Sequence, residues 1–84
     1  MKSFIIADQY VTAKDWAKKN GYKVKARGFV KGEETITYVD NAAQIMACER
    51  EMKMYLHTTW KYRQDSNRLF SLIMSKELDI EAIS

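Results

Sequence analysis

The 84-residue sequence contains no proline, one cysteine, one histidine and three glycines. The single cysteine, Cys48, cannot close an internal disulfide, and with His57 as the one histidine there is no Cys/His set for a zinc site. No uninterrupted apolar run is longer than the four residues Phe4 to Ala7, far short of the about 20 that cross a bilayer. That run is also shorter than the apolar core of a signal peptide. We therefore expect a cytoplasmic protein, stabilised by packing and not inserted in a membrane.

Length and composition predict a single domain that spans residues 1–84. The chain is 46% hydrophobic and 30% charged, which argues against disorder. A domain of this size buries only about 60% of the surface that its unfolded chain exposes, so a monomer has little stability to spare. Self-association would bury more surface, and we expect a homodimer.

Residue types that carry catalysis are scarce and scattered. None of the three glycines precedes a Lys-Ser or Lys-Thr pair, so there is no phosphate-binding loop. Cys48 and His57 are nine residues apart on a predicted helix, which directs them to opposite faces. Asp15 is expected to form a capping box with Thr12 at a helix start. We expect a non-enzymatic protein with no catalytic residues, no cofactor and no metal site.

Hydrophobic periodicity predicts an α+β fold in the order β-α-β-β-α-α, with a small three-stranded antiparallel sheet packed on a long amphipathic helix. The expected elements are a buried strand at 3–7, a helix at 13–20, strands at 22–30 and 35–39, a helix from 41 to about 64, and a last helix that follows a break at 65–67 and ends near residue 75. The tail, residues 77–84, is expected to add a final turn or to fray.

Charge is divided unevenly along the chain. Residues 1–31 carry eight basic and two acidic residues, whereas residues 32–84 carry six basic and nine acidic residues. A basic end and an acidic end can orient a protein toward a polyanion or toward a second copy of itself.

The basic half contains the strongest functional pattern. Residues 22–27 alternate apolar and basic side chains, and Gly32-Glu33 fits a two-residue hairpin turn. Pairing outward from this turn places Lys31 opposite Glu34 and Phe29 opposite Ile36. The face predicted to be exposed carries four cations and two aromatics, Lys23, Lys25, Arg27, Lys31, Phe29 and Tyr38. Cations that follow phosphates, beside aromatics that stack on bases, indicate binding of RNA or single-stranded nucleic acid.

An alternative arrangement places Phe29 and Tyr38 beneath a helix, with the lysines at the rim of the sheet. A one-residue change of register exchanges the two faces of a strand, so both arrangements stay open at this point. The alternative function is that of a module that binds another protein directly.

The predicted helix at 41–64 would be about 36 Å long, longer than the about 30 Å diameter of a globule of this size. Methionines and aromatics on an overhanging helix suit adaptable contacts. The predicted dimer or partner interface consists of Met46, Met54, Tyr55 and Tyr62.

Short length, absent proline, several methionines, a basic hairpin and no catalytic set together resemble the small accessory proteins of tailed bacteriophages. This resemblance rests on the character of the whole chain and on no motif, so it assigns no role to any residue. It implies a protein of the host cytoplasm that blocks host defence, either as an RNA-binding inhibitor, for example of a toxin nuclease, or by docking on a host enzyme, as anti-restriction and anti-CRISPR proteins do. The net charge of +3 argues against DNA mimicry.

Overall fold

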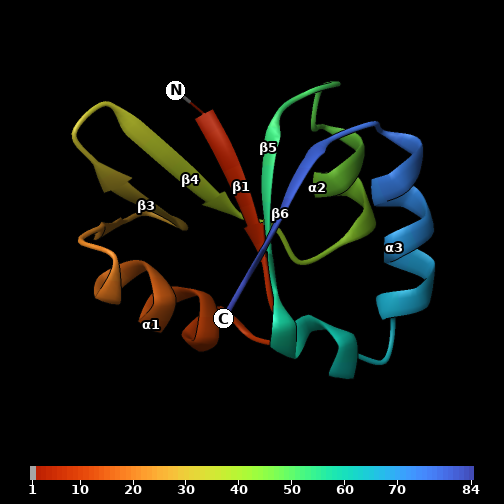
Figure 1. The fold of residues 1–84 in the computed structure, drawn as a ribbon, viewed down its shortest axis with the longest axis horizontal. Coiled ribbons are helices and arrows are strands. Elements are labelled where there is room, and N and C mark those ends of the chain that lie inside the picture. Colours follow the sequence, from red (N-terminus) through yellow and green to blue (C-terminus); the bar gives the residue numbers. More distant parts are fainter. Residues whose placement is uncertain (1) are drawn as a thin grey trace.

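The computed structural model describes residues 2–84, which contain six strands, three α-helices and one 3-10 helix. In order, the elements are β1 (Lys2–Ile6), α1 (Tyr10–Lys19), β2 (Lys23–Lys25), β3 (Gly28–Lys31), β4 (Glu34–Tyr38), α2 (Ala42–Met46), β5 (Lys53–His57), the 3-10 helix η1 (Thr58–Tyr62), α3 (Ser66–Ser75) and β6 (Asp79–Ile83) (Figure 1).

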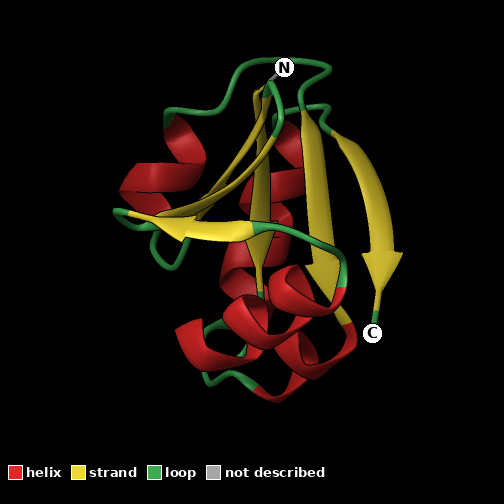
Figure 2. Cartoon of the chain, turned by 90° about the vertical axis from the view of Figure 1, so that its left-hand side faces the viewer, coloured by secondary structure: helices red, strands yellow, loops and turns green. Residues whose placement is uncertain are grey.

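The strands form one mixed sheet in the order β2-β3-β4-β1-β5-β6. Strand β1 pairs in parallel with β4 and β5, and β6 extends the parallel part beyond β5. Strands β2, β3 and β4 form an antiparallel meander at the other edge. Along the strand direction, the two termini lie at opposite ends of the sheet, as marked in Figure 2.

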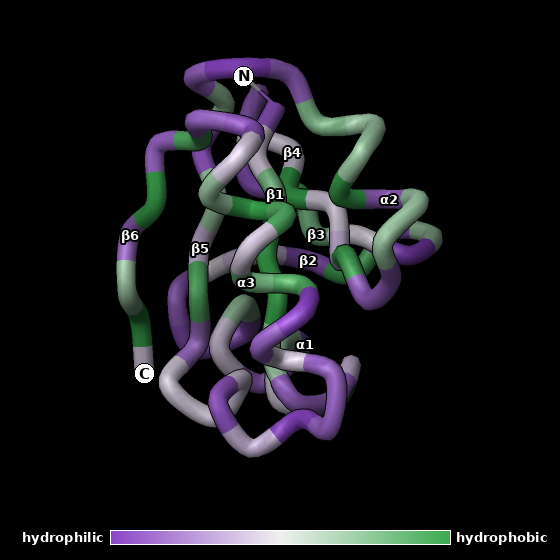
Figure 3. Tube along the Cα trace, turned by 90° about the vertical axis from the view of Figure 1, so that its right-hand side faces the viewer, coloured by the Kyte–Doolittle hydropathy of each residue, from purple (hydrophilic) through white to green (hydrophobic). Residues whose placement is uncertain are grey.

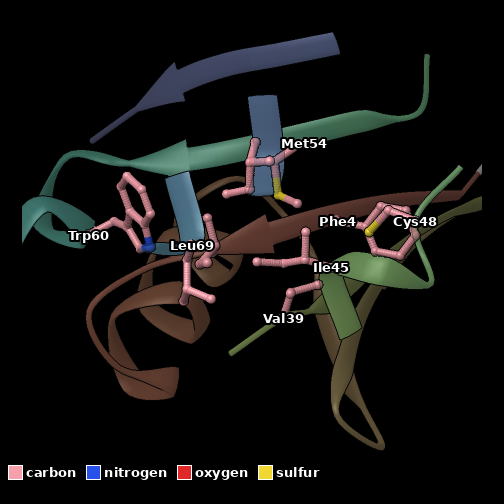
Figure 4. Packing of buried hydrophobic residues seen from close by; sticks show 9 residues of the cluster. Phe4, Val39, Ile45, Cys48, Met54, Trp60 and Leu69 are labelled. Carbon is pink, nitrogen blue, oxygen red and sulfur yellow. The ribbon is translucent and has the colours of Figure 1, made fainter. Parts of the chain in front are cut away.

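Two apolar cores lie on opposite faces of this sheet. Helix α1 covers one face, where Ala13 and Ala17 pack on Ile5 and Phe29. Helices α2 and α3 cover the other face. Figure 4 shows this second core, in which seven labelled side chains meet between the sheet and the two helices: Phe4, Val39, Ile45, Cys48, Met54, Trp60 and Leu69.

The prediction of a three-stranded antiparallel sheet on a long helix is wrong. Residues 41–64 form α2, β5 and η1 instead, and the turn before β5 contains Glu51 at φ +69°, a left-handed conformation that no helix interior contains. In β5, Met54 and Leu56 face α2 and α3, while Tyr55 faces α1. The error arose because residues 41–64 contain no glycine or proline and their apolar residues also recur at helical spacing, which masked the short alternating run of β5.

The buried strand predicted at 3–7 is present as β1 (Lys2–Ile6), one residue earlier, and the last helix ends at Ser75. The expected capping box is wrong, because α1 begins at Tyr10 and its N-cap residue, Gln9, makes no side-chain cap bond. The tail is neither a helical turn nor frayed, since residues 79–83 pair with β5 as β6. Figure 3 shows β1 as hydrophobic and the edge strand β6 as alternating.

The predicted hairpin turn at Gly32-Glu33 and its register are confirmed: Lys31 pairs with Glu34 and Phe29 with Ile36. The strand predicted at 22–30 is divided into β2 and β3 by a turn at Ala26 and Arg27, so Lys25 pairs with Gly28. Ala26 takes a left-handed conformation there, with φ 54°.

Gly28 is required for the contact between β3 and β4. A Cβ atom on Gly28 would lie 2.5 Å from the backbone oxygen of Ile36, and strand pairing prevents that oxygen from moving away. We expect Gly28→Ala to lower the free energy of unfolding by about 1–3 kcal/mol, measured by urea denaturation. An unchanged unfolding midpoint would contradict this account of the hairpin.

Ala26→Gly, in the turn two residues before Gly28, is the matched control and should change stability in the opposite direction. Glycine accepts a positive φ without steric cost, so the strain of Ala26 is relieved, although the unfolded chain gains some freedom. We expect stability to rise by up to about 1 kcal/mol in the same denaturation experiment. A destabilised Ala26→Gly protein would contradict it.

Candidate functional site

Two lysines of the predicted nucleic-acid face project from β2 on the side of the sheet opposite α1. This follows from pairing, because Val24, which lies between them, is paired with buried Phe29 on the α1 side. Lys23 and Lys25 are exposed, and neither forms an ion pair within the described part of the chain. On the same side, Lys25, Gly28, Val30, Thr35 and Thr37 line an open hollow of about 530 Å³. We call this side of β2, β3 and β4 the open sheet face.

The other two predicted cations are exposed but have partners. Arg27 forms an exposed ion pair with Asp40 at 3.3 Å. The Lys31 ammonium donates to the backbone oxygen of Asn20, just after the last turn of α1, and lies 5.2 Å from the centre of the Tyr22 ring. Lys31 therefore stabilises the negative end of α1, which leaves Lys23 and Lys25 as the cations without a fixed partner.

Phe29 and Tyr38 do not lie on an exposed face, contrary to the predicted stacking role. They are 0% and 3% exposed and pack beneath α1, where Tyr10 contacts both rings. The predicted register is correct, but the face that carries these aromatics is the one that α1 covers. This is the alternative arrangement left open by the sequence.

The predicted interface residues are dispersed. Met54 is fully buried in the core, so it cannot form an interface, and the overhanging helix expected to carry it does not exist. Met46 on α2 and Tyr62 on η1 are 57% and 74% exposed, while Tyr55 is half-buried against Trp16. The argument for a homodimer through the long helix is therefore lost.

A second site, which sequence reasoning did not find, lies where the parallel strands end. It is an open crevice of about 560 Å³ between the segments that follow β1, β4 and β5. Its lining comprises Asp8, Gln9, Tyr38, Asp40, Tyr62, Arg63, Gln64 and Asp65. From β1 the chain leaves toward α1, whereas from β4 and β5 it leaves toward the opposite face. Parallel sheets bind ligands where neighbouring connections diverge in this way. We call this site the strand-end crevice.

Asp8 at the start of α1 is held by hydrogen bonds from several elements. Its Oδ1 accepts from the Thr59 hydroxyl at 2.9 Å and from the backbone N–H of Gln9 at 2.8 Å. Hydrogen bonding from the Thr12 side chain, followed by these bonds and opposed by desolvation, holds the pKa of Asp8 below its ordinary value of 3.8. Asp8 therefore provides the negative charge that the helix start favours, which explains why α1 needs no other acidic residue in its first turn.

The Thr59 hydroxyl lies between a carboxylate and an imidazole. Its oxygen is 2.9 Å from Asp8 Oδ1 and 2.9 Å from His57 Nδ1. The Thr59 backbone N–H also donates to Nδ1 at 3.2 Å, so that nitrogen is an acceptor when this bond forms. One hydroxyl proton cannot serve both acceptors, and it goes to Asp8.

Arg63 ties the strand ends together. Its guanidinium binds Asp65 through two bonds of 2.9 and 3.0 Å and donates to the backbone oxygen of Asp40 at 2.7 Å. A longer contact of 3.5 Å reaches the backbone oxygen of Ala7. The pKa of Asp65 is lowered, first by its hydrogen bonds from Arg63. Because its side chain is only 14% exposed and its donors are engaged, Arg63 fixes the crevice wall.

The Tyr38 hydroxyl has no hydrogen-bond partner within residues 2–84. Burial raises its pKa, and the charges next in effect are Asp40 and Arg63, which line the crevice as Tyr38 does. The hydroxyl is therefore protonated at neutral pH and lies within electrostatic reach of the crevice walls. Tyr38 thus has a position different from the one predicted for it: its ring is buried, and its hydroxyl is a donor without a protein acceptor at the crevice.

One signal in the sequence could have revealed the crevice. Polar residues follow each parallel strand directly: Asp8 after β1, Asp40 after β4 and Thr59 after β5. The carboxyl ends of parallel strands meet at one edge of a sheet, so these residues would have been grouped had 53–57 been recognised as a strand.

Comparison with protein-family models, with curated proteins and with solved structures finds no match to this chain. Among residues 2–84, no three histidine, cysteine or carboxylate side chains are arranged to hold a metal ion. No helix in the same range has the length and apolar character needed to cross a membrane. The chemistry of the open sheet face and of the strand-end crevice therefore carries the functional interpretation.

Asp8→Asn tests the hydrogen-bond network at the start of α1. Because the folded pKa of Asp8 is lowered, its ionised form stabilises the fold, and this contribution disappears as pH falls through the folded pKa. At pH 7 we expect the variant to be less stable by about 1–3 kcal/mol, measured by urea denaturation. The difference from wild type should shrink below pH 3.8, the ordinary pKa of the carboxyl group.

Asp15→Asn removes the same charge from an exposed residue of α1 and is the control. It should change stability at pH 7 by less than about 0.5 kcal/mol. If Asp8→Asn and Asp15→Asn have equal effects at pH 7, the proposed role of Asp8 is wrong.

Proposed function

We propose that this chain is a non-enzymatic protein that binds RNA or single-stranded nucleic acid, with the phosphate backbone on the open sheet face. The observation that carries the proposal is the placement of Lys23 and Lys25, which are exposed and have no fixed counterion on that face. Ammonium groups without protein partners recruit counterions, and their release on binding a polyanion favours association.

The shape of the open sheet face supports a backbone contact. Between the two lysines and the threonines of β4, the surface is formed by Gly28 and half-buried Val30, so no large side chain blocks the approach of a strand. Thr35 and Thr37 offer hydroxyl donors that suit phosphate and sugar oxygens.

The structure changes how such binding would work. With Phe29 and Tyr38 buried, no aromatic on this face can stack on a base, so the open sheet face contributes charge and hydroxyl contacts alone. Binding here should depend strongly on salt and little on sequence. Inhibition of a host defence nuclease, as the resemblance to phage accessory proteins implies, would be one use of such binding.

The test is the salt dependence of binding to a labelled single-stranded RNA. The logarithm of affinity should fall linearly with the logarithm of salt concentration, by about 0.7 per phosphate contact. Lys25→Glu should weaken binding and reduce that slope by about 0.7, and adding Lys23→Glu should reduce it again.

Arg68→Glu makes the same charge change on the exposed surface of α3, away from the open sheet face. It should lower affinity only slightly and leave the slope unchanged. No binding at about 50 mM salt, where phosphate contacts are strong, would refute the proposal. A protein complex recovered from lysate after nuclease treatment would then favour direct docking on a host protein.

A further inference from the structure

The carboxylates of the strand-end crevice already accept hydrogen bonds from the protein. Both oxygens of Asp65 are bound to Arg63. Oδ2 of Asp40 accepts from Arg27, and Oδ1 accepts from Asn41 at 3.3 Å. Asp8 accepts from Thr59 and from a backbone N–H, as described above. Each of the three carboxylates therefore already has protein donors, and a ligand that carries acceptors can pair with the free donors of the crevice.

The free donors come from three parts of the crevice wall. The Tyr38 hydroxyl has no protein partner, and Tyr38 lines the crevice although most of its side chain is buried. The side-chain amides of Gln9 and Gln64 are exposed and make no hydrogen bond within the described chain. These donors are open to an acceptor from a ligand or from solvent.

Charge argues against a phosphate as the group that enters. Asp8, Asp40 and Asp65 face Arg63 and Arg27, so the crevice carries more negative than positive groups. The helix start that would attract an anion is already occupied by the Asp8 carboxylate. An acceptor-rich group without negative charge fits better.

An aromatic platform lies at the same place. Tyr62 lines the crevice and is 74% exposed. The Lys61 ammonium lies 5.1 Å from the centre of the Tyr62 ring, over one of its faces. The other face is available for stacking on a planar ligand.

We propose that the strand-end crevice binds a nucleobase, an uncharged planar ring with carbonyl or ring-nitrogen acceptors. The base stacks on Tyr62, and one of its acceptors accepts a hydrogen bond from the Tyr38 hydroxyl. The base comes either from a free nucleoside or from an unstacked position in a strand. The second source rests on the proposed function, because it requires a strand bound on the open sheet face. The two sites are close enough for this, since Arg27 in the β2–β3 turn forms an ion pair with Asp40 in the crevice.

The first experiment titrates ¹⁵N-labelled protein with each of four nucleosides and follows backbone amide shifts, with ribose 5-phosphate as the ligand that lacks a base. A nucleoside should shift the amides of residues 38–40 and 62–65, and ribose 5-phosphate should not. Tyr62→Ala should weaken binding by about five- to a hundredfold, the range for one lost stack. Tyr38→Phe should weaken it by about two- to tenfold.

Tyr55→Phe is the control, because Tyr55 is a half-buried tyrosine that does not line the crevice. It should bind as wild type does. Tyr62 is exposed, so Tyr62→Ala should fold even if Tyr38→Phe does not, and the amide spectrum of each variant reports its fold.

The second experiment compares a single-stranded RNA with the same strand containing abasic positions. If the base comes from a strand, abasic positions and Tyr62→Ala should each lower affinity without changing the salt slope, whereas Lys25→Glu changes the slope. If Lys25→Glu does not change RNA binding, the proposed function is refuted, while binding of nucleosides in the crevice is unaffected by that result. If neither nucleosides nor strands respond to Tyr38→Phe or Tyr62→Ala, the crevice inference is overturned, even where lysine-dependent binding persists.

Discussion

The burial of β1 on both faces is the constraint on which the rest of the structure depends. Phe4 and Ile6 enter the core with α2 and α3, while Ile5 enters the core with α1, and all three are at most 6% exposed. A strand in that position needs hydrogen-bonding partners on both edges and helices on both faces. Parallel pairing with β4 and β5 provides the hydrogen-bonding partners on both edges. Helices on opposite faces of the sheet cover both faces of the strand.

The position of the crevice follows from that arrangement. With β1 in the middle, the connection from β1 leads to one face and those from β4 and β5 to the other, so polar side chains at their carboxyl ends converge without filling the gap. Arg63 then spans the gap by donating to the backbone oxygens of Asp40 and Ala7, which lie beyond the ends of β4 and β1. The crevice is therefore built by connections from three strands and stabilised by one buried guanidinium.

The sequence pattern predicted correctly those elements that are determined by residues close together in the chain. The run Phe4 to Ala7 indicated a buried strand, Gly32-Glu33 indicated the turn and register of one hairpin, and the apolar residues of α3 indicated a helix; all three are present. Residues 53–57 were wrongly predicted because the stretch 41–64 contains no glycine or proline and its apolar residues also fit helical spacing, while the partner strand β1 is about 50 residues away. That single error hid the parallel sheet, and with it the crevice. The lysines of the open sheet face were identified as exposed because their alternation is local, whereas the burial of Phe29 and Tyr38 was decided by α1.

The two sites are adjacent but depend on different forces, which makes them separable. Arg27 and Asp40 join the β2–β3 turn to the crevice through an ion pair whose side chains are 67% and 37% exposed, and such pairs contribute about 0–1 kcal/mol. The contact therefore holds the turn beside the crevice without locking it. Ammonium groups on the open sheet face act through charge and weaken as salt rises. The Tyr38 hydroxyl and the exposed Tyr62 ring act through hydrogen bonding and stacking, which release no counterions. A strand that spanned both sites would lose its contacts with the open sheet face at high salt and keep its contact in the crevice.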